Sequence, residues 1–138
     1  MDETQRHAAC SCGALSVSVR GDPPVVGMCH CLACQRRTGS AFGLAAFFAR
    51  DQVTAIDGAR STWSRVAESG ATLTFNFCPS CGSNVFWERS SRPDMIAVAV
   101  GAFADPDFPG PKRMVWTQSR HHWLDTVGDL AGHPASPA

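Results

Sequence analysis

The chain has 138 residues, of which 44% are hydrophobic and 17% charged, and its 12 Lys and Arg balance 12 Asp and Glu. This length suits one domain with one core, and zero formal net charge argues against a general nucleic-acid or anionic-membrane binder. No apolar run approaches the ~20 residues that span a bilayer, and the polar start Met1–Arg6 lacks the apolar centre of a signal peptide. We therefore expect a cytoplasmic protein, in a compartment where thiols stay reduced.

The chain is expected to comprise a disordered lead over residues 1–7, one domain over residues 8–127 and a loose tail over residues 128–138. Alternating apolar and polar residues, and short apolar runs between turn residues, predict strands in the domain. These strands are Leu15–Val19, Val25–Cys29, Ala41–Arg50, Val53–Ile56, Thr62–Ser64, Thr72–Phe77, Val85–Trp87, Met95–Val100 and Met114–Trp116. A helical turn is expected after Cys34, and a short closing helix over His121–Val127. The pattern predicts a mainly β fold.

Seven cysteines occur in three groups with the spacing of metal ligands: CSC at 10–12, CHCLAC at 29–34 and CPSC at 78–81. Neighbours this close rarely reach the geometry of a disulfide, but they can share a metal ion. The first and last groups together supply four thiolates, which saturate a tetrahedral zinc ion and make a closed structural site. The predicted ligands of this site are Cys10, Cys12, Cys78 and Cys81.

The middle group, Cys29, Cys31 and Cys34, supplies three thiolates and leaves one tetrahedral position vacant. A small-molecule ligand would bind at that position, so this group is the candidate catalytic site. The sets of four and three account for all seven cysteines, so two zinc ions per chain are predicted. The alternative is a set of buried free cysteines that act as small hydrophobic residues, and the clustering argues against it.

Polar residues close to the middle group are candidate substrate-binding residues. They are Arg36, Arg37, Thr38 and Ser40, which could bind a carboxylate or another polar group of a ligand, or could form an ordinary solvated turn. His30 lies between two of the cysteines, and on an extended strand its ring would point away from theirs, so we do not expect it to be a ligand. His121 and His122 could reach a ligand pocket.

The motifs CSCG, CHCLACQRRTGS and FCPSCGS, in this order, resemble the family of glutathione-dependent formaldehyde-activating enzymes, or S-(hydroxymethyl)glutathione synthases, to which centromere protein V is similar. The resemblance covers about residues 8–125. It implies an all-β fold of small antiparallel sheets called a β-tent, a structural zinc held by the four-cysteine set, and a catalytic zinc held by the three-cysteine set.

The resemblance also implies an activity, that of a carbon-sulfur lyase acting on a thiol such as glutathione and an aldehyde such as formaldehyde. Zinc held by Cys29, Cys31 and Cys34 would bind the substrate sulfur and favour its thiolate, which is the nucleophile. The alternative is a non-catalytic, zinc-stabilised binding module. Expected partners are a small-molecule thiol and an aldehyde, without nucleic acid or membrane, for a monomer or homodimer.

Overall fold

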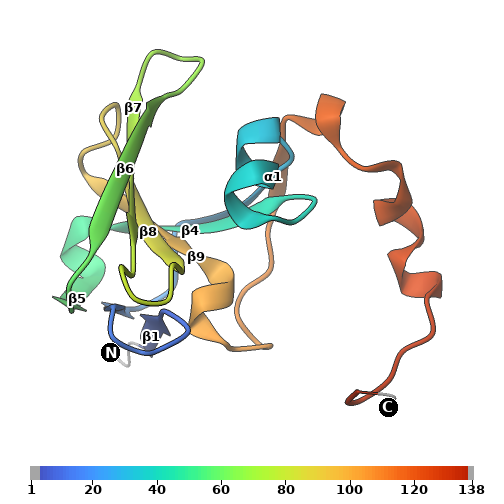
Figure 1. Ribbon diagram of the computed structural model, residues 1–138, viewed down its shortest axis with the longest axis horizontal. Coiled ribbons are helices and arrows are strands. Elements are labelled where there is room, and N and C mark those ends of the chain that lie inside the picture. Colours follow the sequence, from blue (N-terminus) through green and yellow to red (C-terminus); the bar gives the residue numbers. More distant parts are fainter. Residues whose placement is uncertain (1–3, 137–138) are drawn as a thin grey trace.

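The computed structural model describes residues 4–136, and this part of the chain is mainly β (Figure 1). The strands are β1 (Gln5–Ala9), β2 (Ser16–Arg20), β3 (Val25–Cys29), β4 (Gly43–Ala49), β5 (Val53–Asp57), β6 (Ser61–Val66), β7 (Thr72–Phe77), β8 (Asn84–Arg89), β9 (Met95–Ala99) and β10 (Arg113–Val115). The helices are α1 (Leu32–Thr38) and the short 3-10 helices η1 (Arg50–Gln52), η2 (Val100–Phe103), η3 (Thr117–Ser119) and η4 (His122–Asp129). The mainly β prediction is confirmed.

Two sheets organise the described residues. Seven strands form one sheet in the order β10-β3-β4-β9-β8-β7-β6, and three form another in the order β1-β2-β5. Neighbouring strands run antiparallel, except that β10 runs parallel to β3. A parallel neighbour needs a long crossover connection, so it could not be read from local patterns.

One face of the seven-stranded sheet is buried against the small sheet. Val26, Ala46, Val98 and Phe86 form a cross-strand row through β3, β4, β9 and β8. All four side chains are buried in one apolar cluster together with Val17 and Val19 of β2. Full burial of a Val or Phe side chain stabilises a fold by ~1.5–3 kcal/mol. This cluster therefore fixes the register of the strands on which the cysteines lie.

The other face of the seven-stranded sheet is open, because side chains alternate between the two faces of a strand. Its central row crosses six strands and consists of Val25, Phe47, Ala97, Trp87, Phe75 and Trp63. On the same face, the next cross-strand pair of β3 and β4 after Val25 and Phe47 is Gly27 with Ala45. The pair after that is Cys29 with Gly43. These glycines and alanines contribute almost no side-chain volume. The β3–β4 part of this face is therefore hollow, while aromatic rings fill its β7–β8 part.

The ends of the chain differ in part from the expectation. Gln5–Ala9 forms β1 and pairs with β2, so the disordered lead expected over residues 1–7 is wrong for residues 5–7, whose backbone a hydrogen-bonded neighbour orders. Residues 1–3 lie outside the described residues. The closing helix is found as η4, in 3-10 geometry, at the end of an arm that extends away from both sheets (Figure 1). Among the described residues, no helix is long and apolar enough to cross a membrane.

Candidate functional site

The structure brings the first and last cysteine groups together, as their spacing predicts. The sulfurs of Cys10, Cys12, Cys78 and Cys81 all lie within 4.8 Å of one another. Cys12 Sγ lies 3.6 Å from Cys10 Sγ and 3.6 Å from Cys78 Sγ. A tetrahedron with Zn–S bonds of ~2.3 Å has sulfurs ~3.8 Å apart, so the spacing fits a zinc-sized ion.

The two halves of this cluster are built by similar turns. Gly13 and Gly82, each directly after a cysteine, have φ of 83° and 79°, a left-handed conformation that costs glycine little. The Gly13 N–H donates to the carbonyl of Cys10, and the Gly82 N–H to that of Cys78. The two turns thereby orient their cysteine side chains toward each other.

Two elements position the middle cysteine group. Cys29 ends β3, Cys31 is the N-cap of α1, and Cys34 lies in the first turn of that helix. Their sulfurs all lie within 4.8 Å of one another. The Cys34 N–H donates to Cys31 Sγ at 3.3 Å, just as the Cys81 N–H donates to Cys78 Sγ at 3.5 Å. Backbone donors of this kind stabilise sulfur as thiolate.

Negative charge in this group concentrates on Cys34. Hydrogen bonding from Cys29 and Cys31, together with the charge and hydrogen bond of Arg37, lowers the pKa of Cys34 to about 5. The pKa of Cys29 is raised well above its ordinary value, mainly because its thiol donates to Cys34 and because it is partly buried. A divalent cation would replace the shared proton and hold all three sulfurs as thiolates. The donor set and its spacing therefore fit a metal ion.

A cavity of about 960 Å³ on the open face of the large sheet reaches this group of three. Cys29, Cys31 and Cys34 are in its wall, whereas none of the other four cysteines lines it. Gly27, Gly43, Ala45 and Ala97 form part of its floor, with Phe47 and Trp87 beside them. The hollow has the size and the mostly apolar lining of a small-molecule site.

The four polar residues proposed from the sequence fall in different places. Arg37 is in the cavity wall, where its guanidinium lies 4.3 Å from the ring centroid of Trp87 and donates to Asn84 Oδ1 at 3.0 Å. Arg36 is exposed on α1 and does not line the cavity. Thr38 Oγ1 donates to the carbonyl of Cys34 at 2.9 Å and accepts from the Ser40 N–H at 3.1 Å. Thr38 and Ser40 thus end the helix and lie outside the cavity.

The histidines are held apart from the sulfurs. His30 is fully buried, and within the described residues neither ring nitrogen has a hydrogen-bond partner. Burial lowers its pKa, and Arg120 and His121 lower it further, so the ring is neutral. His30 is not part of either cysteine cluster of the described residues.

His121 connects the C-terminal arm, the segment with η3 and η4, to α1. The Trp123 indole donates to His121 Nδ1 at 3.0 Å, so the His121 proton is on Nε2, which donates to Gln35 Oε1 at 3.0 Å. Gln35 in turn donates to the carbonyls of His30 and Ser119. Neither His121 nor His122 lines the cavity.

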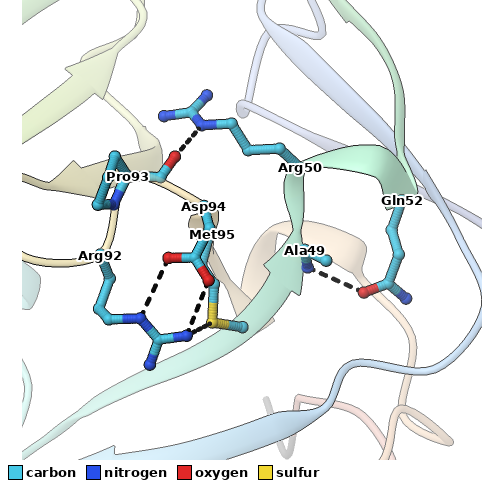
Figure 2. A network of polar contacts seen from close by, with 7 residues as sticks. All are labelled: Ala49, Arg50, Gln52, Arg92, Pro93, Asp94 and Met95. Carbon is cyan, nitrogen blue, oxygen red and sulfur yellow. Dashed lines mark hydrogen bonds and ion pairs between the residues drawn. The ribbon is translucent and has the colours of Figure 1, made fainter.

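Sequence reasoning missed several residues of the cavity wall. Arg65, Arg89, Arg92 and Arg113 lie on three different strands and one turn, and strand pairing brings them to the same face as the cysteines. Arg92 is neutralised by Asp94, whose carboxylate accepts from both Nε and Nη2 of the guanidinium (Figure 2). No local motif marks these arginines, because only the register of distant strands places them together.

The fold and site define a mainly β protein with two cysteine clusters that could hold metal ions, one complete with four sulfurs and one with three sulfurs open to a ligand cavity. The profile of the family "glutathione-dependent formaldehyde-activating enzyme" matches residues 5–119, a range that includes every cysteine. The chain belongs to this family of enzymes.

Among solved structures, the chain is similar to a crystal structure of a Rhodobacter sphaeroides protein, with 21% sequence identity and a TM-score of 0.58. The match covers 78% of this chain and 98% of that one, and at this identity it supports the fold alone. Comparison with curated proteins finds no match.

Proposed function

We propose that the protein is a zinc-dependent carbon-sulfur lyase-type enzyme that joins or separates a thiol and an aldehyde. One observation carries the proposal: three of the seven cysteines form a group that lines a cavity, while the other four form a complete set outside it. Family membership supports a thiol such as glutathione and an aldehyde such as formaldehyde as the substrates.

The residues of the cavity wall have complementary roles in this proposal. Zinc held by Cys29, Cys31 and Cys34 would supply a fourth coordination position at which a substrate thiol ionises. Arg37 places a positive charge beside Cys34 and offsets part of the negative charge of the sulfurs. The Trp87 ring beneath Arg37 keeps the guanidinium in place and excludes water from that side.

The proposed reaction needs no oxidant or reductant. The electron pair of the substrate sulfur forms a new S–C bond to the aldehyde carbon, and the π pair of the C=O bond moves to oxygen. Oxygen takes up one proton in place of the proton that left the thiol, which gives a hemithioacetal, the S-hydroxymethyl adduct when the aldehyde is formaldehyde. The protein contributes by holding the sulfur and the aldehyde together in a cavity that is mostly apolar.

The test is exchange spectroscopy by NMR on glutathione and formaldehyde at equilibrium, with the spontaneous rate subtracted. We expect the zinc-loaded wild type to accelerate exchange and Cys31→Ser to abolish the acceleration while keeping the circular dichroism spectrum of the wild type. His133→Ala is the control, because this residue is exposed in the C-terminal tail and should not change the rate. Equal rates for wild type and Cys31→Ser would refute the proposal. If the wild-type protein nevertheless bound the thiol, equal rates would indicate a non-catalytic binding module.

A further inference from the structure

Two arginines occupy one row at the far end of the cavity from the three cysteines. Arg65 of β6 pairs with Leu73 of β7, and Leu73 pairs with Arg89 of β8. Cross-strand partners lie on the same face of a sheet, so both arginines flank Leu73 on the cavity side. Adjacent strands are ~4.8 Å apart, which puts the two backbones ~10 Å from each other, within joint reach of one anionic group.

No carboxylate in the part of the chain that the structure describes pairs with these two guanidinium groups. Arg89 donates to Ser91 Oγ at 2.9 Å and to Ser69 Oγ at 3.0 Å, and both partners are neutral. Arg65 lies 5.8 Å from the centroid of the Phe75 ring. Within residues 4–136, neither arginine forms an ion pair with a carboxylate, in contrast to Arg92 (Figure 2).

The charged residues that line the cavity are mostly positive. Arg37, Arg65, Arg89, Arg92 and Arg113 line the cavity, and Glu68 is the one acidic residue among its described lining residues. Concave surfaces of one charge sign concentrate ligands of the opposite sign. The planar donors of a guanidinium match the geometry of a carboxylate, and two hydroxyl groups hold that of Arg89 in place.

We infer that Arg65 and Arg89 bind a carboxylate of the substrate thiol at a point remote from its sulfur, and so select elongated anionic thiols. The inference rests on the proposed function, because it takes the three-cysteine group as the site of the sulfur. Arg37 and Cys34 both lie against Gly43, and the guanidinium of Arg37 lies over the Trp87 ring. Arg89 follows Trp87 by two residues, ~7 Å further along β8. The separation between sulfur and carboxylate is then on the order of 10 Å.

The test measures binding rather than turnover, by calorimetric titration of the zinc-loaded protein with two pairs of thiols. The long pair is 8-mercaptooctanoate and 8-mercapto-1-octanol, and the short pair is mercaptoacetate and 2-mercaptoethanol. We expect the wild type to bind the long carboxylate about tenfold more tightly than the long alcohol, as for a charge-assisted hydrogen bond. In the double variant Arg65→Gln/Arg89→Gln this preference should fall below about threefold, while the affinities for the short pair stay unchanged.

The control is a second double variant, Arg36→Gln/Arg60→Gln, which removes two positive charges outside the cavity. Both arginines are exposed and neither lines the cavity, and the guanidinium of Arg60 lies 5.7 Å from the ring of Phe86, on the opposite face of the sheet. The control variant should keep the preference for the long carboxylate. If the short thiols still bind, an undiminished preference in Arg65→Gln/Arg89→Gln, or its loss in the control variant, overturns the inference. Failure of all four thiols to bind the wild type would instead overturn the proposed function, and the inference with it.

Discussion

The guanidinium of Arg37 lies over the Trp87 ring, and its charge lowers the pKa of the neighbouring Cys34 thiol. The side chain of Arg37 thereby joins Cys34, in α1, to the aromatic row of the sheet. The contact fixes the position of a positive charge between the two ends of the cavity.

Arg37→Gln should weaken binding of a neutral thiol such as 2-mercaptoethanol to the zinc-loaded protein by about tenfold, because a charge next to the sulfur group is lost. Calorimetric titration measures the change. Arg36→Gln removes the same charge from the neighbouring residue, which is exposed and outside the cavity, and should leave the affinity unchanged. Equal losses in both variants would show that only the net charge of α1 matters.

Gly43→Ala should reduce thiol binding without unfolding the protein. The added Cβ would lie 2.7 Å from Arg37 Nη2 and 3.3 Å from Cys34 Cβ, so the flexible arginine must move away from the sulfurs. Gly27→Ala is the matched control on the neighbouring strand, where the nearest atom, Arg113 Nε, would be at an ordinary contact distance of 3.7 Å. Titration with 2-mercaptoethanol and thermal unfolding separate the two effects, and normal binding by Gly43→Ala would contradict the role given to Arg37.

The two cysteine groups should respond differently to loss of one ligand. Cys10→Ser should lower Tm by about 10 °C or more, because the four-sulfur set joins two turns that are far apart in the sequence. Cys34→Ser should lower Tm by only a few degrees and abolish thiol binding. Metal analysis is expected to show two zinc ions in the wild type and about one in each variant. Similar destabilisation by the two changes would disprove this division of labour.

Gly58→Ala should destabilise the protein strongly, by about 3 kcal/mol or more, without touching the cavity. Gly58 has φ of 103°, and the added Cβ would lie 1.8 Å from the carbonyl oxygen of Ala14, a backbone atom that cannot rotate away. Gly70→Ala tests the conformational part alone, since φ is 91° there and no atom would lie within 4 Å. It should cost about 1–2 kcal/mol. Denaturant unfolding gives both values, and equal costs would rule out the steric contribution.

Local sequence patterns predicted the elements and the grouping of the sulfurs well. The alternation of Leu73, Phe75 and Phe77 predicted β7 with the bounds that the structure has. The spacing of the cysteines predicted which sulfurs meet, because two residues between thiols suit a single turn around one metal. That zinc occupies both groups stays a prediction.

The far end of the cavity could not be predicted, because it depends on pairing between distant segments. Arg65 and Arg89 face the same hollow only through the register of β6, β7 and β8. The sequence instead drew attention to Thr38 and Ser40 because they follow Cys34 closely. Thr38 lies one helical turn beyond Cys34 at the end of α1, where its hydroxyl bonds backbone groups, and Ser40 follows the helix, so closeness in sequence did not bring them into the wall.

The small residues that form the floor of the cavity allow its size to change with little effect on the stability of the fold. Gly27, Gly43 and Ala45 leave space that larger side chains would occupy, while the opposite face of the same strands carries the apolar core. A single enlargement such as Ala45→Leu would therefore shorten the ligand that fits without disturbing the packing beneath it. Relatives with this framework could diverge toward bulkier or slimmer thiols by exchanging a few floor residues and keeping every sulfur.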